Sequence, residues 1–126
     1  MNYDDRVTKE YVEGLIAGAG AKIATGSYVG TGEYGENHPN SLTFDFAPKL
    51  VYISTDIHTD GGEMLFLFRG APHGHFLFGN PAYAIVQASN VTWTENGLSW
   101  FSIGSRANAE YQCNISARTY YYTAIG

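Results

Sequence analysis

Two segments of the sequence bring together side chains that could do chemistry. His73 and His75 are two positions apart, so on a strand they project from the same face and could share a metal ion. The spacing fixes no third ligand, although a symmetric oligomer could supply equivalent histidines around its axis. Histidine beside glycine and proline is also common in turns. The sequence favours this interpretation, in which the two histidines bind no metal.

The second segment, residues 56–63, holds Asp56, His58, Asp60 and Glu63 within eight positions. Acid/base hydrolysis of glycans uses two carboxylates on opposite sides of the substrate, with pKa values separated by their environments. A loop supplies such groups without fixing their separation, and this density of aspartate and glycine is also typical of a solvated turn. We therefore expect a protein that is not an enzyme, and a glycan-cleaving activity is the least supported hypothesis.

Other catalytic motifs are absent from the sequence. It contains no Gly-x-Ser-x-Gly elbow, no phosphate-binding glycine-rich loop and no His-Glu-x-x-His motif. The single cysteine, Cys113, cannot form an intrachain disulfide and has no neighbours typical of an activated thiol. We expect it to be buried as a small hydrophobic residue, and the sequence predicts no cofactor.

A third feature is the excess of aromatic, asparagine and glycine residues near turns. Flat aromatic faces stack on the C–H groups of sugars, and short polar side chains bond sugar hydroxyls. The competing interpretation is that the aromatics fill the core or an interface between chains, which the sequence favours for Trp93 and Trp100. The residues predicted to form a glycan-binding surface are Tyr34, Asn37, His38, Asn40, Trp93 and Asn96.

Length and charge limit the partners of these residues. The chain has 126 residues, enough for one domain, and a net charge of −5 from 12 acidic and 7 basic side chains. A positive field that would draw it to nucleic acid is missing. No apolar run approaches the roughly 20 residues that span a bilayer, and the acidic N-terminus does not resemble a signal peptide. We expect a soluble protein without nucleic-acid partners or membrane insertion.

The elements that must position these side chains are predicted to be strands. Aromatic residues make up 15% of the chain and there are 15 glycines, a composition that favours short strands and tight turns. The spacing of the strands predicts an all-β fold over residues 21–126, an antiparallel β-sandwich or jelly-roll-like domain. Strands are predicted at residues 23–29, 42–46, 49–55, 63–69, 75–78, 83–88, 91–94 and 119–125.

One hairpin is predicted with a specific turn. Asn96-Gly97 is the usual pair of positive-φ residues in a type I′ turn, flanked here by alternating strands. Glu95 and Leu98 would then flank the turn. Trp93 and Trp100 would lie close to cross-strand pairing distance.

Residues 1–20 differ from the rest and are predicted to form a helical connector. Val7, Tyr11 and Leu15 recur every four residues between an aspartate pair and a glycine stop, which indicates one apolar helical face over residues 4–18. A helix of about three turns is marginal alone in water, so it should pack on the domain or on copies of itself. These three residues are the predicted oligomerisation contacts.

Three segments together resemble small β-domains of bacteriophage tail proteins. Residues 8–14 resemble the Thr-Lys-x-Tyr-Val-Asp connector of tail fibres, with Glu13 in place of the usual aspartate. Residues 25–32 and 42–51 are similar to the Gly-Thr-Tyr-x-Gly-x-Gly and Phe-x-Pro-Lys-Leu-Val patterns of tail-associated domains from phages and prophages of Gram-positive, especially Firmicute, bacteria. Residues 119–126 are similar to their tyrosine-rich, glycine-ended C-terminus.

The resemblance implies a non-catalytic component of a phage tail or prophage-encoded particle, made in the bacterial cytoplasm and usually homotrimeric. It implies a place at or near the tip that contacts the host, with other tail proteins and bacterial cell-surface glycan as partners. Several weak sugar sites on one trimer would act together through effective concentration. The leading hypothesis is therefore a tail-fibre or tail-tip receptor-binding domain, and the main alternative is a decoration or scaffold protein that binds no glycan.

Overall fold

The computed structural model describes residues 22–55, 63–78 and 84–126, and within them the fold is all-β. One sheet of eight antiparallel strands has the order β1-β8-β3-β4-β5-β6-β7-β2. This confirms the predicted antiparallel all-β class. The predicted N-terminal helix, with Val7, Tyr11 and Leu15, lies outside the described residues. The strands are β1 (Ile23–Val29), β2 (Asn40–Thr43), β3 (Leu50–Ser54), β4 (Glu63–Phe68), β5 (His73–Phe78), β6 (Ala84–Trp93), β7 (Gly97–Ser102) and β8 (Thr119–Ile125), with a short 3₁₀ turn η1 (Gly104–Arg106) after β7.

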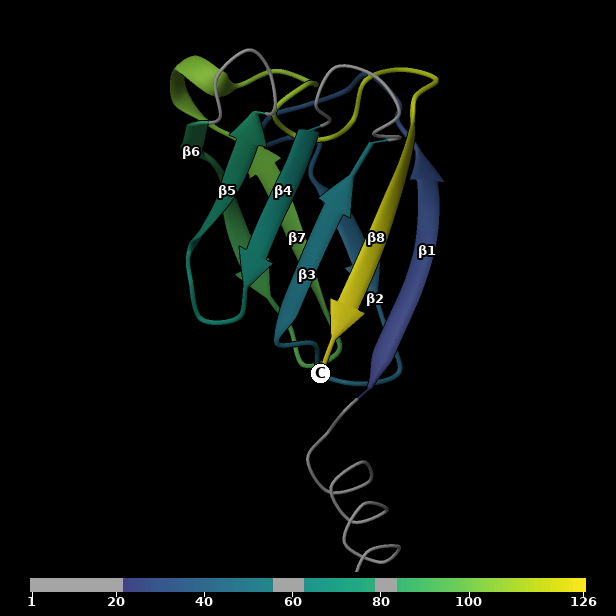
Figure 1. The fold of residues 1–126 in the computed structure, drawn as a ribbon. Helices are drawn as coiled ribbons and strands as arrows, with labels where there is room; N and C mark the ends of the chain where they lie inside the picture. The colour runs from purple at the N-terminus through teal and green to yellow at the C-terminus, as the bar shows by residue number, and fades with distance from the viewer. Residues whose placement is uncertain (1–21, 56–62, 79–83) are drawn as a thin grey trace, which may run out of the picture.

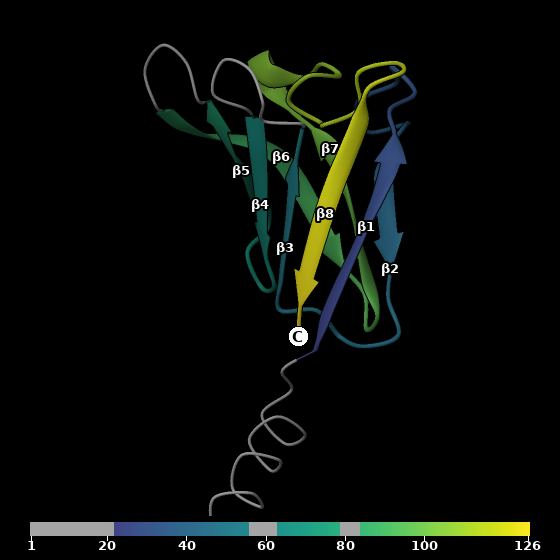
Figure 2. The ribbon, with the colours of Figure 1, turned by 45° about the vertical axis from the view of Figure 1, so that its right-hand side comes forward.

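The sheet curls on itself and encloses the core. Figures 1 and 2 show β1, β8, β3 and β4 side by side, with β6, β7 and β2 behind them. Because the order begins at β1 and ends at β2, these two strands are the edges of the sheet, and the curl brings them to the same side of the molecule. The buried apolar residues inside are Phe46, Val51, Ile53, Leu65, Leu67, Phe76, Ala88, Leu98, Trp100, Cys113, Tyr120 and Ala124.

Alternation along the strands explains which residues reach the core. Val51 and Ile53 of β3 are fully buried, whereas Tyr52 between them is only partly covered. The continuous apolar run of residues 49–55 would suit a strand covered on both faces, but the outward side of β3 stays partly exposed. Residues 42–46 were predicted as one strand, but β2 ends at Thr43. Phe44 and Phe46, which follow β2, still pack on the core.

The β6–β7 hairpin is confirmed, but its turn is not of type I′. Trp93 pairs with Leu98, and the Thr94 N–H donates to the Gly97 carbonyl at 2.9 Å, so Glu95 and Asn96 are the central residues. Neither Asn96 nor Gly97 has a positive φ. Gly97 is needed for another reason: it pairs with Thr43 of β2, and a Cβ there would meet the carbonyl oxygen of Leu42.

This register also decides the environment of the two tryptophans. Trp93 pairs with Leu98 and Val91 pairs with Trp100, so all four side chains lie on the inner face. Trp100 is completely buried and Trp93 packs against the core. The two segments predicted around them, 83–88 and 91–94, form one continuous strand, β6.

Candidate functional site

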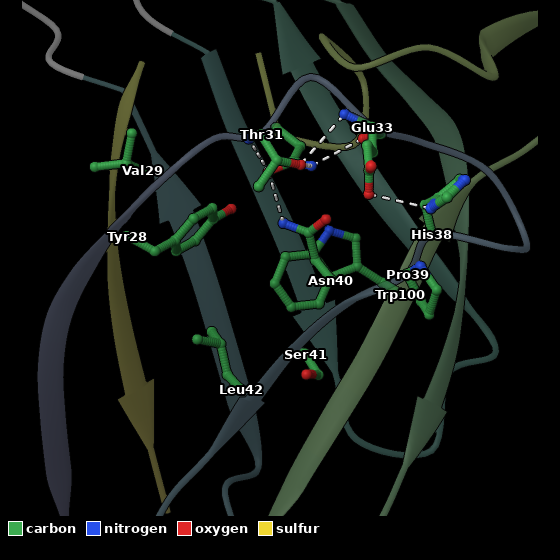
Figure 3. Close-up of a pocket in the computed structure, with 11 residues that line it drawn as sticks. Tyr28, Val29, Thr31, Glu33, His38, Pro39, Asn40, Ser41, Leu42 and Trp100 are labelled. Carbon is green, nitrogen blue, oxygen red and sulfur yellow. Dashed lines mark hydrogen bonds and ion pairs between the residues drawn. The ribbon is translucent and has the colours of Figure 1, made fainter. Parts of the chain in front are cut away.

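A pocket opens where the curled sheet fails to close. Its volume is about 280 Å³, and it lies between the edge strands β1 and β2, which we call the seam. Figure 3 shows side chains from both strands and from the loop that joins them directed toward this space. The residues that line this seam pocket are Tyr28, Val29, Thr31, Glu33, His38, Pro39, Asn40, Ser41, Leu42, Trp100 and Asn114.

The aromatic wall of the seam pocket is the partly buried Tyr28 ring, which the completely buried Trp100 holds from behind. The Tyr28 ring stacks on Tyr120 with centroids 5.4 Å apart and lies 6.4 Å from the Trp100 ring. The Tyr28 hydroxyl donates to the Cys113 carbonyl at 2.7 Å, and the Trp100 Nε1–H donates to the Gln112 carbonyl at 2.9 Å. Burial raises the pKa of Tyr28, and charge interactions with Cys113 and Tyr120 add to the shift. The phenol therefore stays neutral and keeps its donor role.

Gln112 holds the loop of the pocket in place although it belongs to a different part of the chain. Its side chain is fully buried. The Nε2 group donates to the His38 carbonyl at 2.8 Å and to Asn40 Oδ1 at 2.9 Å, whereas Oε1 accepts from the N–H groups of Gly35 and Ser102, each at 2.9 Å. Because so many partners converge on one amide, the pocket's polar wall is preorganised.

Asn114 performs the same task on the other side of the loop. Its Nδ2 group donates to Thr31 Oγ1 and to the Glu33 carbonyl, both at 2.8 Å. Its Oδ1 accepts from the Thr31 N–H at 3.1 Å. Thr31 Oγ1 also accepts from the Glu33 N–H at 3.3 Å, so both its lone pairs are used and its proton is directed to other acceptors.

The segment that carries these two amides is strained. Cys113 and Ala117 are its two non-glycine residues with positive φ, at 59° and 66°. Such strain persists where the surroundings impose it, and it often accompanies functional sites. Here the αL turn at Cys113 separates Gln112 from Asn114, whose side chains both bond the loop between β1 and β2. Cys113 is buried, as predicted, and burial raises the pKa of its thiol.

Glu33 and His38 are paired at the rim of the seam pocket. Glu33 Oε2 lies 3.1 Å from His38 Nδ1, and both side chains are more than half exposed (Figure 3). Among the described residues, Glu33 is the single carboxylate in the lining, and no lysine or arginine lines the pocket. The other polar side chains of the lining can both donate and accept hydrogen bonds, and they lie around the aromatic wall.

The structure divides the predicted glycan-binding residues between two ends of the molecule. Tyr34, Asn37, His38 and Asn40 lie in or beside the β1–β2 connection, and two of them, His38 and Asn40, line the seam pocket. Trp93 and Asn96 lie at the β6–β7 turn, at the opposite end of the strands (Figure 1). The six residues therefore do not form one surface.

At the opposite end, Trp93 is engaged with its own neighbours. The Arg69 guanidinium lies 4.9 Å from the Trp93 ring centroid, and its Nη2 donates to the Thr94 carbonyl at 3.0 Å. Asn96 contributes its backbone carbonyl to the Phe44 N–H at 2.8 Å. These contacts join the β6–β7 turn to the segment after β2 and give both residues a role in packing.

The predicted metal and carboxylate clusters are only partly described. His73 and His75 occupy alternate positions of β5, with the buried Gly74 between them. In residues 22–55, 63–78 and 84–126, no group of three histidine, cysteine, aspartate or glutamate side chains is placed to hold a metal ion. Asp56, His58 and Asp60 lie outside the described residues. Glu63 is described, and it does not line the seam pocket.

Glu63 has an unusual environment of its own. Its Oε2 lies 3.5 Å from Arg118 Nη1, and its side chain is about 23% exposed. Burial raises the pKa of Glu63 to about 7, a hydrogen bond and repulsion from Glu110 add to this effect, and Arg118 opposes it. The folded protein therefore binds a proton here that the unfolded chain releases at lower pH.

This shift predicts a pH dependence of stability. Because the pKa of Glu63 is about 7 in the folded state and near 4.5 in the unfolded state, its contribution is complete below pH 4.5 and is lost as pH rises through 7. In wild type we expect the free energy of unfolding to fall by on the order of 1 kcal/mol between pH 5 and 8, allowing for solvent screening. In Glu63→Gln this fall should be absent. Urea denaturation at both pH values measures it, with the exposed Glu95→Gln as control. If the free energy of unfolding changes equally between pH 5 and 8 in Glu63→Gln and in wild type, Glu63 is not the group responsible for the pH dependence.

Several residues of the pocket carry no signal in the sequence. Gln112 and Asn114 fall in an irregular stretch between β7 and β8, and neither strand nor helix periodicity marks them. Tyr28 and Trp100 are recognisable as core residues, but their approach to the loop depends on the curl of the sheet. Of the residues that line the pocket, His38 and Asn40 were predicted from the composition near turns.

Comparisons with known proteins give no neighbour for this arrangement. No protein-family model, curated protein or solved structure matches the chain. Among the residues that the structure describes, none forms a helix with the length and apolar character needed to cross a bilayer.

Proposed function

We propose that this protein is a non-catalytic attachment protein that binds bacterial cell-surface glycan in the seam pocket. The observation that carries the proposal is the combination, in one cavity, of an aromatic wall with convergent hydroxyl, amide and carboxylate groups. Sugars are bound in this way, through C–H contacts with aromatic faces and hydrogen bonds to their hydroxyls. Two of the residues chosen from the sequence, His38 and Asn40, belong to this lining.

Binding is favoured over cleavage by the chemistry of the lining. Glycoside hydrolysis uses two carboxyl groups about 5–10 Å apart across the sugar. The seam pocket offers the Glu33 carboxylate, which is already paired with His38. We therefore assign Glu33 a binding role.

The setting that we propose is the tail of a phage or prophage-encoded particle. The motifs at residues 8–14, 25–32, 42–51 and 119–126 support it, and the all-β fold of the described residues agrees with it. In this proposal the helical connector of residues 1–20 joins three copies, each carrying a domain whose curled sheet forms a β-sandwich or jelly-roll-like body. Host glycan and neighbouring tail proteins are the partners.

The outer surface of the sheet supports assembly into a homotrimer. The outward residues of β1, β8, β3 and β4 form what we call the outer face, and none of them is charged. One row across these strands is entirely apolar: Ile23, Ile125, Leu50 and Phe68 are successive cross-strand neighbours. In a chain with a net charge of −5, this face lets copies approach without repulsion between like charges.

The same face favours a second function, that of a scaffold or decoration protein without glycan binding. Exposed apolar residues on the outer face would then contact neighbouring particle proteins, and the seam pocket would have no ligand. Glycan binding and assembly are separable by experiment, because Val29 of β1 is the one residue that the pocket lining shares with the outer face.

Glycan binding is tested with the full chain on isolated cell walls and on an array of bacterial glycans. We expect binding that His38→Ala weakens at least tenfold, because the substitution removes a polar side chain of the lining and releases Glu33. Asn37→Ala is the matched control, since Asn37 is exposed on the same loop and does not line the pocket. Absence of binding to every glycan and cell wall, with the protein folded, would leave the scaffold function.

A further inference from the structure

We infer that the seam pocket selects uncharged glycans and rejects glycans that carry phosphate, sulfate or carboxylate groups. The inference rests on the proposed function and adds the chemical class of the ligand. It follows from the position of Glu33 in the lining and from where the cationic side chains of the described chain lie.

Glu33 gives the seam pocket a negative rim. Its carboxylate can accept two or more hydrogen bonds, and one of its oxygens, Oε2, is already paired with His38 Nδ1 at 3.1 Å. The other oxygen is left to accept from sugar hydroxyls. Because His38 is paired with a carboxylate, the rim has no isolated positive charge that would attract an anion.

The lysine and arginine side chains of the described residues lie outside the pocket lining. Arg69 donates to the carbonyls of Pro48 and Thr94 at the opposite end of the strands, where Lys22 and Lys49 also lie. At the pocket's own end, Arg118 pairs with Glu63, and Arg106 lies 6.0 Å from the Tyr111 ring centroid. None of the five lines the pocket.

The remaining polar groups suit hydroxyls and amides. Thr31 Oγ1 accepts two hydrogen bonds from the protein, so its own proton can be donated to a ligand oxygen. Ser41 is exposed on β2 and can donate or accept. Together with the Glu33 carboxylate, these groups match vicinal hydroxyls, which donate and accept at neighbouring positions. An anionic group placed here would lie within a Debye length, about 8 Å at physiological salt, of the Glu33 charge.

The test uses an array in which each neutral bacterial glycan is paired with a counterpart bearing uronate or phosphate. We expect the full chain to bind neutral members at least tenfold more tightly than their charged partners. Glu33→Lys should reduce this ratio at least fivefold, because the substitution reverses the charge at the rim. Glu36→Lys makes the same change of net charge on the same loop, but Glu36 does not line the pocket, and its ratio should stay within twofold of wild type.

The outcomes separate this inference from the function on which it rests. If charged glycans bind as tightly as neutral ones, or if Glu33→Lys and Glu36→Lys change the ratio equally, the selectivity is wrong and glycan binding stands. If no member of either class binds the folded protein, both the glycan function and the selectivity are wrong. Thermal unfolding of each variant confirms that it is folded.

Discussion

Replacing Gln112 by leucine is expected to lower the free energy of unfolding by about 4 kcal/mol and to abolish glycan binding. Leucine has a similar volume, so the loss is one of hydrogen bonds rather than of packing. The substitution leaves the N–H groups of Gly35 and Ser102 and the carbonyl of His38 without their buried partner. Each unsatisfied buried group costs about 1–3 kcal/mol.

Urea denaturation measures this loss, and a glycan titration of the folded fraction measures binding. Gln87→Leu is the matched control, because Gln87 is exposed on β6, and its effect should stay within about 0.5 kcal/mol. A Gln112→Leu protein as stable as the control would show that the loop is not held by this amide. If the folded variant still binds glycan, glycan recognition does not require the loop geometry that Gln112 holds.

Placing a charge on the outer face is expected to weaken the homotrimer that we propose. Ile23 is 67% exposed at the edge of the apolar row that crosses β1, β8, β3 and β4. Ile23→Arg would place an unpaired charge in a charge-free contact, where burial without a partner is strongly unfavourable. We expect the dissociation constant of the assembly to rise at least tenfold, with little change in the stability of each chain.

Sedimentation equilibrium over a range of protein concentrations measures the assembly. The chain offers a close control in Ile85→Arg, because Ile85 is 66% exposed on β6 of the same sheet, outside the outer face. Equal weakening by both substitutions would indicate a general effect of charge. A wild-type chain that stays monomeric at every concentration would rule out self-assembly through this face.

The strands were accessible from the sequence because their signals are local. Residues 23–29 and 119–125 were predicted as strands from runs of β-branched and aromatic residues, and β1 and β8 have these bounds. The burial of Cys113 followed from its being an isolated cysteine with no activating neighbours. Leu42, Phe44 and Phe46 alternate with polar residues and all reach the core, although the strand ends before the last two.

The β6–β7 turn shows where local signals were insufficient. Asn-Gly strongly favours a type I′ turn in isolation, but the pairing of β2 with β7 fixes Gly97 as a strand residue. The turn therefore moves by one residue toward the N-terminus, and Gly97 is required for close approach to Leu42. A contact between segments more than fifty residues apart outweighed the preference of a dipeptide.

Amino-acid composition and periodicity by themselves determined an antiparallel all-β domain and placed polar residues in the loop after the first strand. Tertiary structure alone decided that this loop faces a pocket, because the pocket exists only where the curl of the sheet leaves β1 and β2 unpaired. It also decided that Gln112 and Asn114, more than seventy residues away, hold the loop. The physical reason is that periodicity reports which face of an element is buried, whereas a hydrogen bond between distant segments depends on where the whole chain brings them.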